Sequence, residues 1–194
     1  MNKLFPIFLK LEQLQVLLIG AGPVGLEKIS ALLQQSPKAK VRVVAKDVSV
    51  DFRAFVDGRE YIDLCERSFE DVDLDGVDLV VVASNNVVLN QHVQRLTRKQ
   101  NILLNVADKP DLCDFYLGAV VVKGDLKIGI STNGKSPTIA KRLKEFLYGL
   151  LPEEIDETLG LMYEMREQLR GDFWEKVRML NAHTRELLER RQND

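Results

Sequence analysis

The chain has 194 residues, of which 45% are hydrophobic, and its formal net charge is −2. This length suits one large domain or one domain with appendages, and the hydrophobic share is enough for a sizeable core. Because the chain has no net positive charge, no global field is available to hold nucleic acid or an anionic membrane, and we expect neither as a partner.

The first predicted strand, at residues 16–19, runs directly into a glycine-rich turn. The stretch VLLIGAGPVGLEK places Gly20, Gly22 and Gly25 between apolar strand residues and an amphipathic helix. In a dinucleotide-binding turn the first glycine permits the tight turn, the second lets the backbone reach a pyrophosphate, and the third lets the helix approach the strand. The pattern predicts a dinucleotide site. The alternative is a purely structural tight turn.

Strands and helices alternate from this turn to about residue 106, which predicts a parallel sheet with helices on both faces. Apolar runs such as VDLVVVA are typical of strands that are buried on both faces. We therefore expect an α/β fold with a Rossmann-type parallel sheet. Further strands are expected at residues 41–44, 61–65, 79–83 and 102–106, and helices at 26–35 and 88–99.

The pattern changes after Asp108. The stretch AVVVKGDLKIGIST alternates around a Lys-Gly-Asp turn, which indicates a β-hairpin. Ser136 then supplies an N-cap and Pro137 a first residue for a helix. Helical spacing of apolar residues continues beyond Pro152. The apolar face of the helix after Pro137 is expected at Ile139, Leu143, Phe146, Leu147 and Leu150.

These patterns divide the chain into three expected parts. The first is the Rossmann domain, the second a small α+β segment of hairpin plus helix, and the third a C-terminal helical domain. Their bounds are 1–112, 113–150 and 151–194.

Polar residues at strand ends are candidates for the cofactor crevice, because open α/β sheets bind ligands at the carboxyl ends of their strands. The second strand ends in VVAKD. There Lys46 favours a 2′-phosphate, and hence NADP, whereas Asp47 could hold the ribose hydroxyls of NAD. Charge alone leaves both open, and both residues could also be solvated loop residues. Ser84, after the fourth strand, and Asn105, in the fifth, complete the cofactor candidates.

Asp108 follows the fifth strand, in the stretch NVADKPDLCDF. A carboxylate at the carboxyl end of the sheet is placed to act on a bound ligand, so Asp108 is the candidate general base. The alternative is a turn residue ahead of Pro110, since aspartate is common in such turns.

Basic residues gather between positions 123 and 145. Six of them stand against two acidic residues in this stretch, an excess that would suit a polyanionic ligand. The alternative is a solvated helix face with hairpin lysines. The basic residues are Lys123, Lys127, Lys135, Lys141, Arg142 and Lys144.

The sequence also indicates a compartment. The stretch MNKLFPIFLKLE is broken by Pro6, Lys10 and Glu12 and lacks the core of a signal peptide, and no apolar run approaches the length of a membrane span. Cys65 and Cys113 lie far apart without CxxC spacing, which argues against a zinc site or a disulfide framework. We therefore expect a cytoplasmic protein with no resident metal.

Five stretches together resemble the precorrin-2 dehydrogenase family, which includes the N-terminal module of siroheme synthase. They occur in the family's order and cover roughly residues 4–150. Five motifs in order are far more specific than one glycine pattern. The chain departs from many relatives by reading ASNN for ATDD and STNG for SxGG. The five stretches are FPIFLKLE, VLLIGAGPVGLEK, VVASNNVVLN, ILLNVADKPDLCDF and IGISTNGKSPTIAKRL.

The resemblance implies NAD-dependent oxidation of precorrin-2 to sirohydrochlorin, followed in bifunctional members by insertion of ferrous iron to give siroheme. It places the family aspartate on Asp108 and favours NAD over NADP. It also implies a homodimer formed through the segment that begins near Cys113. The motifs do not separate members that insert iron from those that do not. The cofactor-binding set is then Gly20, Gly22, Pro23, Val24, Gly25, Lys46, Asp47, Ser84 and Asn105.

Precorrin-2 is a polycarboxylate, so the resemblance gives the basic stretch a substrate. A second class of function remains open, a regulatory module that binds the dinucleotide without chemistry. Asp108 discriminates between the two, because only the enzyme needs its carboxylate. The expected substrate-binding residues are Thr132, Lys135, Ser136, Lys141 and Arg142.

Overall fold

The computed structural model describes residues 4–168, 174–179 and 181–182. The chain forms two compact units. The first runs to Gly118 and includes residues 133–135, and the second contains residues 119–132 and the chain from Ser136 onward. Within the described ranges, no helix is both long and apolar enough to cross a membrane.

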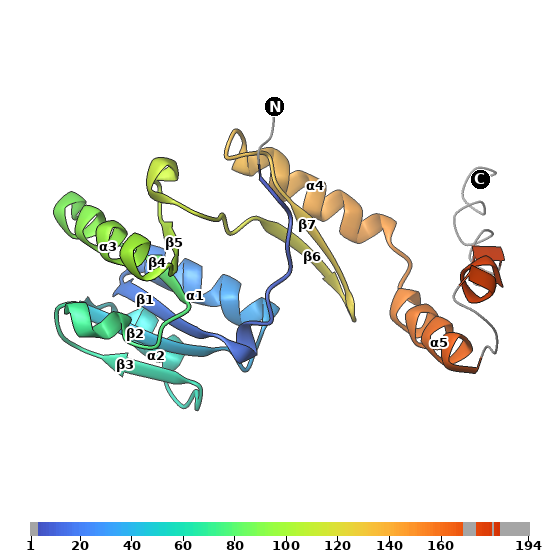
Figure 1. Ribbon diagram of the computed structural model, residues 1–194, viewed down its shortest axis with the longest axis horizontal. Coiled ribbons are helices and arrows are strands. Elements are labelled where there is room, and N and C mark those ends of the chain that lie inside the picture. The colour runs from blue at the N-terminus through green and yellow to red at the C-terminus, as the bar shows by residue number, and fades with distance from the viewer. Residues whose placement is uncertain (1–3, 169–173, 180, 183–194) are drawn as a thin grey trace. The chain divides into compact units, whose positions relative to one another are not determined.

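The first unit is built on a five-stranded parallel sheet, shown in Figure 1. Its strand order is β3-β2-β1-β4-β5, the order of the first five strands of a Rossmann fold. The expected Rossmann-type sheet is therefore confirmed, although the second strand runs on to Val48. The strands are β1 (Gln15–Ala21), β2 (Lys40–Val48), β3 (Ile62–Cys65), β4 (Leu79–Val82) and β5 (Leu103–Val106).

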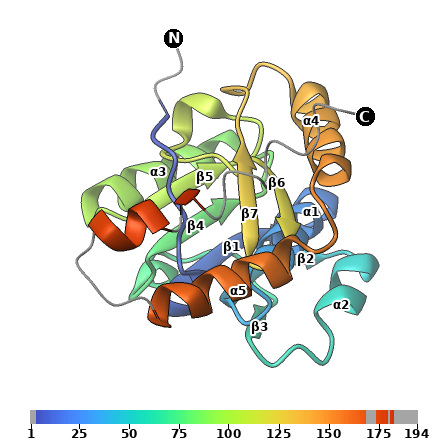
Figure 2. The same cartoon turned by 90° about the vertical axis from the view of Figure 1, so that its right-hand side faces the viewer.

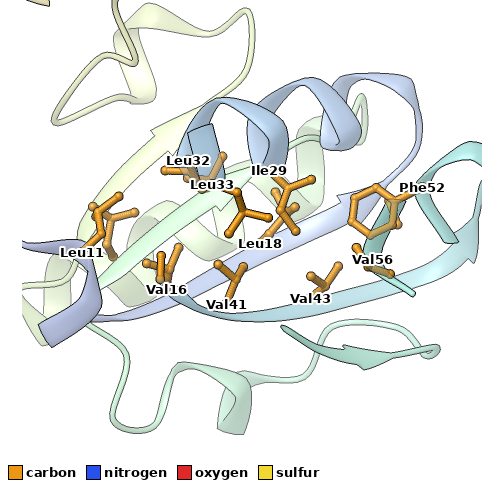
Figure 3. Packing of buried hydrophobic residues seen from close by; sticks show 14 of the residues in the cluster. Leu11, Val16, Leu18, Ile29, Leu32, Leu33, Val41, Val43, Phe52 and Val56 are labelled. Carbon is orange, nitrogen blue, oxygen red and sulfur yellow. The ribbon is translucent and has the colours of Figure 1, made fainter. Parts of the chain in front are cut away.

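Helices cover both faces of this sheet because the strands are apolar on both sides. Side chains of α1 lie over β1 and β2 (Figure 3), and Phe52 and Val56 of α2 extend the same cluster. On the opposite face, α3 contributes Val93 to a second cluster with residues of β1, β4 and β5. The helices are α1 (Pro23–Gln35), α2 (Val50–Val56) and α3 (Val87–Gln100), with 3-10 turns η1 (Leu11–Gln13), η2 (Asp71–Leu74) and η3 (Pro110–Leu112).

An ion pair between a half-exposed arginine and a buried carboxylate fixes the turn ahead of β4. The carboxylate of Asp73, a residue only 2% exposed, accepts hydrogen bonds from Arg67 Nη1 at 2.8 Å, Arg67 Nη2 at 2.6 Å and the Glu70 N–H at 2.9 Å. The Arg67 guanidinium lowers the pKa of the Asp73 carboxyl from its ordinary value. A group whose folded pKa is lowered stabilises the fold above its unfolded pKa and loses this effect as the pH falls through the folded value.

We therefore expect Asp73→Asn to lower the free energy of unfolding by about 2 kcal/mol at neutral pH, because hydrogen bonds to a charged group are lost. Below about pH 4, the usual range for an unfolded aspartate, the difference from the wild type should shrink. Urea unfolding at several pH values checks this. An equal loss at low and neutral pH would show that the charge on Asp73 contributes nothing.

The second unit contains a β-hairpin and a helix that packs against both of its strands. Strands β6 (Ala119–Lys123) and β7 (Leu126–Ile130) are antiparallel and adjacent, as Figure 2 shows. Gly124, with φ 56, is the first residue of their two-residue turn. The helix is α4 (Pro137–Leu150), and its cap is as expected, because Ser136 Oγ accepts a hydrogen bond from the Ile139 N–H at 3.2 Å.

Most of the apolar side chains of α4 are exposed. The buried residue of α4 is Ala140, which is 7% exposed. The small side chain of Ala140 lets α4 lie close to the hairpin. Four of the five residues of the expected apolar face are exposed and form a stripe at helical spacing: Ile139, Leu143, Phe146 and Leu150.

Helix α5 (Ile155–Gln168) begins beside the turn of the hairpin. Asp156 Oδ1 accepts a hydrogen bond from the Asp125 N–H at 2.6 Å. Lys123 Nζ, on a residue only 8% exposed, donates to the Leu151 carbonyl at 2.7 Å and to Glu153 Oε1 at 2.8 Å. Residues 174–179 and 181–182 are also helical. The rest of the expected C-terminal helical domain lies outside the described residues.

Candidate active site

The strands of the first unit bring the predicted cofactor residues and Asp108 to one edge of the sheet. Neighbouring strands are parallel, so the chain leaves β1, β2, β4 and β5 at the same edge. Open α/β sheets bind ligands at this edge. The loop after β1 leads into α1, the last residues of β2 contain Lys46, Ser84 follows β4, and Asp108 follows β5.

The three glycines between the end of β1 and the first turn of α1 meet different structural requirements. Gly20 has φ 105, and a Cβ there would lie 2.4 Å from the Ala83 carbonyl oxygen of the neighbouring strand end. A Cβ on Gly25 would lie 2.2 Å from the Gly20 carbonyl oxygen. A Cβ on Gly22 would meet no heavy atom within 4 Å. Packing therefore requires Gly20 and Gly25, whereas the space beside Gly22 is open for a ligand.

We expect Gly25→Ala to destabilise the fold, because the new methyl group meets backbone that cannot move away cheaply. The expected loss is about 1–3 kcal/mol in free energy of unfolding, the usual cost of overpacking. Chemical unfolding measures it, with Gly22→Ala as the matched control. Equal stability of Gly25→Ala and Gly22→Ala would be evidence against the close contact between α1 and β1.

The N-terminus of α1 has the features of an anion-binding site. Side chains of Ser49, Asn86 and Ser136 cap helices α2, α3 and α4, but Gly22 caps α1 without a side-chain hydrogen bond. The first N–H groups of a helix need partners, and the helix dipole favours a negative charge there. Together with the open space at Gly22, this arrangement fits the pyrophosphate of a dinucleotide.

The end of β2 is held against the end of β1. The N–H of Ser49 donates to the Ala21 carbonyl at 3.0 Å, and its hydroxyl donates to the same oxygen at 3.1 Å. Sequence reasoning missed Ser49 and the short helix α2, although a serine ahead of VDFRAFV is an N-cap signal. Lys46 and Asp47 are exposed just before it. Neither side chain has an ion pair with another described residue.

The loop after β4 is held by hydrogen bonds from two asparagines. Ser84 Oγ accepts from the Asn86 N–H at 3.1 Å, and the Ser84 carbonyl accepts from Asn90 Nδ2 at 3.0 Å. Asn90 is 1% exposed. Ser84 is therefore fixed at the carboxyl end of β4, next to the expected cofactor crevice.

Asn105 and Asp108 have different environments. Asn105 is buried, and its Nδ2 donates to the Phe115 carbonyl at 2.8 Å, so the contacts in the structure give it a structural role. Its assignment to the cofactor set remains a prediction.

Asp108 is exposed, has φ 58 and forms no hydrogen bond or ion pair with the described residues. Its carboxylate is thus accessible to a ligand at the sheet edge.

The predicted substrate residues lie in the segment from Thr132 to Arg142. Thr132 Oγ1 accepts from the Ser136 N–H and donates to the Ser136 carbonyl, both at 3.2 Å, so the two residues fix the turn ahead of α4. Lys141 and Arg142 are exposed on α4, and Lys135 is exposed in the turn. No acidic side chain of the described ranges pairs with these three cations. In the same ranges, no group of three or more His, Cys, Asp or Glu side chains is placed to hold a metal ion.

Two family models match the chain. The model described as "Putative NAD(P)-binding" matches residues 7–119, which is more than half of the chain. A second model, "Sirohaem biosynthesis protein central", matches residues 123–147, from the end of β6 through most of α4.

Curated relatives match most of this chain and are longer proteins. The chain is 31% identical over 182 residues to a siroheme synthase of Thioalkalivibrio sulfidiphilus, covering 89% of this chain and 37% of that protein. It is 34% identical over 168 residues to a siroheme synthase of Vesicomyosocius okutanii, covering 87% of this chain and 35% of the relative. The chain therefore spans a little over a third of the length of these relatives.

A solved structure described as SirC, a precorrin-2 dehydrogenase, superimposes on the chain with a TM-score of 0.70 and 27% identity. The match covers 92% of this chain and 88% of that structure. These comparisons agree with the resemblance expected from the five sequence motifs. The open space at Gly22 and the start of α1 without a side-chain cap fit a dinucleotide site. Because the NAD(P)-binding model matches residues 7–119, more than half of the chain, the chain belongs to that family of NAD(P)-binding proteins.

Proposed function

We propose that the protein is an NAD-dependent dehydrogenase that oxidises precorrin-2 to sirohydrochlorin in siroheme biosynthesis. The observation that carries the proposal is the placement of an accessible carboxylate, Asp108, at the same sheet edge as the anion-binding start of α1. The likeness to SirC, which extends over most of both chains, supports this substrate.

The reaction removes a hydride and a proton from the macrocycle. When bound, NAD supplies the acceptor for the hydride. The chain supplies the rest: the N–H groups at the start of α1 hold the pyrophosphate, with Pro23 and Val24 in the cradle, and Lys46, Asp47 and Ser84 border the crevice. The Asp108 carboxylate accepts the proton.

Cations of the segment before and within α4 bind the substrate carboxylates in this proposal. Lys135, Lys141 and Arg142 have no acidic partner among the described residues, so their charges are available to an anionic ligand. Thr132 and Ser136 fix the backbone that carries them.

Both cysteines are free thiols, which supports the expected cytoplasmic, reducing compartment.

We also propose that the chain works as a homodimer joined through residues 113–150. The support is the exposed stripe on α4, where Phe146 is 64% and Ile139 55% exposed. Apolar side chains at helical spacing on an uncovered face are typical of an interface. Residues 1–112 then form the cofactor domain, and residues 151–194 the helical domain that follows the interface.

Replacing Phe146 with glutamate is expected to convert the dimer to a monomer or to weaken it by at least about tenfold, because a charge enters an apolar interface. Light scattering during size exclusion measures the mass. Glu145→Lys, on the same helix but off the stripe, is the control and should remain dimeric. A Phe146→Glu protein with unchanged mass would place the interface elsewhere.

The activity is tested by anaerobic incubation with precorrin-2 and NAD, following NADH and the sirohydrochlorin spectrum. NADH formed together with sirohydrochlorin supports the dehydrogenase. Adding ferrous iron as a second substrate then tests for siroheme, and an enzyme-dependent spectral shift would assign metal insertion as well. Binding of NAD without any oxidation would favour the alternative, a regulatory module that senses the dinucleotide.

A further inference from the structure

Strand β5 forms one edge of the sheet, and its outward polar groups are paired without a sixth strand. The N–H groups of Leu103 and Ala107 point toward β4, where they donate to the carbonyls of Asp78 and Val82. Leu104 and Val106 therefore direct their N–H and carbonyl groups away from β4. An exposed strand edge normally leaves such groups to water or to another chain.

Two consecutive residues, Cys113 and Asp114, pair all four of these groups. The Leu104 N–H donates to Asp114 Oδ2 at 3.0 Å, and the Leu104 carbonyl accepts from the Asp114 N–H at 2.7 Å. The Val106 N–H donates to Cys113 Sγ at 3.2 Å, and the thiol donates to the Val106 carbonyl, also at 3.2 Å. Two side chains and one backbone N–H thus pair the groups that a neighbouring strand would pair, and we call Cys113 and Asp114 the edge clamp.

The edge clamp closes the loop that carries Asp108. Cys113 Sγ also lies 3.2 Å from the Lys109 carbonyl, so one thiol contacts the chain on both sides of Asp108. Burial raises the pKa of the Cys113 thiol, which keeps the S–H proton available for these carbonyls. Asp108 itself has φ 58, a conformation that a non-glycine residue adopts at a cost, and it needs surrounding contacts to hold it there.

We propose that Asp114, together with Cys113, is a positioning residue for Asp108: the edge clamp holds residues 107–112 so that the Asp108 carboxylate points from the sheet edge. The inference rests on the proposed function, in which Asp108 accepts the proton. Asp114 acts through the loop, without touching the substrate. A displacement of about 1 Å in a reacting group can cost about 10²-fold in rate, so loss of the clamp should lower kcat.

The test compares Asp114→Ala with Asp114→Asn and with a matched control. Asp78→Ala is the control, because Asp78 Oδ2 also accepts a strand N–H, that of Gln15 at 2.8 Å, but at the opposite end of the sheet. We expect Asp114→Ala to lower kcat for precorrin-2 oxidation by about 10–100-fold, with the dissociation constant for NAD within about twofold of the wild type. Asp114→Asn keeps an acceptor oxygen and should stay within about threefold in kcat, as should Asp78→Ala.

A double variant separates positioning from general damage. In the Asp108→Asn background, adding Asp114→Ala should lower kcat no further, because residues that act as a unit are not additive. A further loss of the same factor, or an equal loss of kcat in Asp78→Ala, overturns the proposal. Wild-type kcat in Asp114→Ala does the same.

Amide hydrogen exchange tests the edge clamp without measuring activity. Failure of the proposed function can therefore be distinguished from failure of the edge clamp. If the wild-type chain shows no turnover, the proposed function and the catalytic half of this inference fail together. Exchange at Leu104 and at residues 107–109 and 111–112 then decides the structural half. Faster exchange there in Asp114→Ala but not in Asp78→Ala supports the clamp, and unchanged exchange overturns it.

Discussion

Asp108→Asn should abolish most of the turnover while leaving the fold and the affinity for NAD intact. Removing a general base typically costs about 10²–10⁴-fold in rate, and we expect kcat for precorrin-2 oxidation to fall within this range. Asparagine suits the position, because it tolerates the left-handed conformation that Asp108 adopts with φ 58. Steady-state kinetics with precorrin-2 and a separate NAD titration measure the two quantities.

The matched control is Asp111→Asn, an exposed carboxylate of the same loop in η3. It should keep kcat within about threefold, because Asp111 has no assigned part in proton transfer. Near-normal turnover of Asp108→Asn would remove the base assignment. Equal losses in both variants would show that net charge in the loop matters rather than the particular carboxylate.

The second large effect is expected at Gly22. Gly22→Asp places a carboxylate in the open space where the pyrophosphate of NAD should lie, so two negative charges come close. We expect the dissociation constant for NAD to rise by at least about 10²-fold, with a smaller effect at high salt because exposed charges are screened. Fluorescence or calorimetric titration measures the constant.

Gly22→Ala separates size from charge at this position. A Cβ meets no heavy atom there, so both Gly22 variants should fold as well as the wild type. The alanine variant should bind NAD more weakly than the wild type but more tightly than Gly22→Asp. Unchanged titrations for Gly22→Asp would refute the cradle, even if the protein remained folded.

The sheet and its glycine turn could be predicted from the sequence because their signals are local. Apolar runs define β1 and β4, and the glycine pattern corresponds to two close contacts, at Gly20 and Gly25, and to open space at Gly22. Helix α4 was predictable for the same reason, since Ser136 and Pro137 are adjacent in the sequence.

Other features depend on contacts that a linear pattern does not contain. The exposed stripe on α4 arises because the hairpin accepts the side with Ala140, a choice that apolar spacing alone does not reveal. Cys113 and Asp114 carry no periodic signal, yet they pair the outer edge of β5. The hydrogen bond from the Asn105 amide to the Phe115 carbonyl is likewise absent from any local pattern, and the cofactor role of Asn105 stays a prediction.

The buried ammonium of Lys123 limits where this chain could be cut. Its acceptors, the Leu151 carbonyl and Glu153, lie just beyond α4, and the Asp125 N–H depends on Asp156 in α5. A shortened chain that stops at Leu150 would leave a lysine that is only 8% exposed without either acceptor. Removing the C-terminal helices is therefore expected to destabilise the hairpin, because Lys123 and the Asp125 N–H would lose their hydrogen-bond partners.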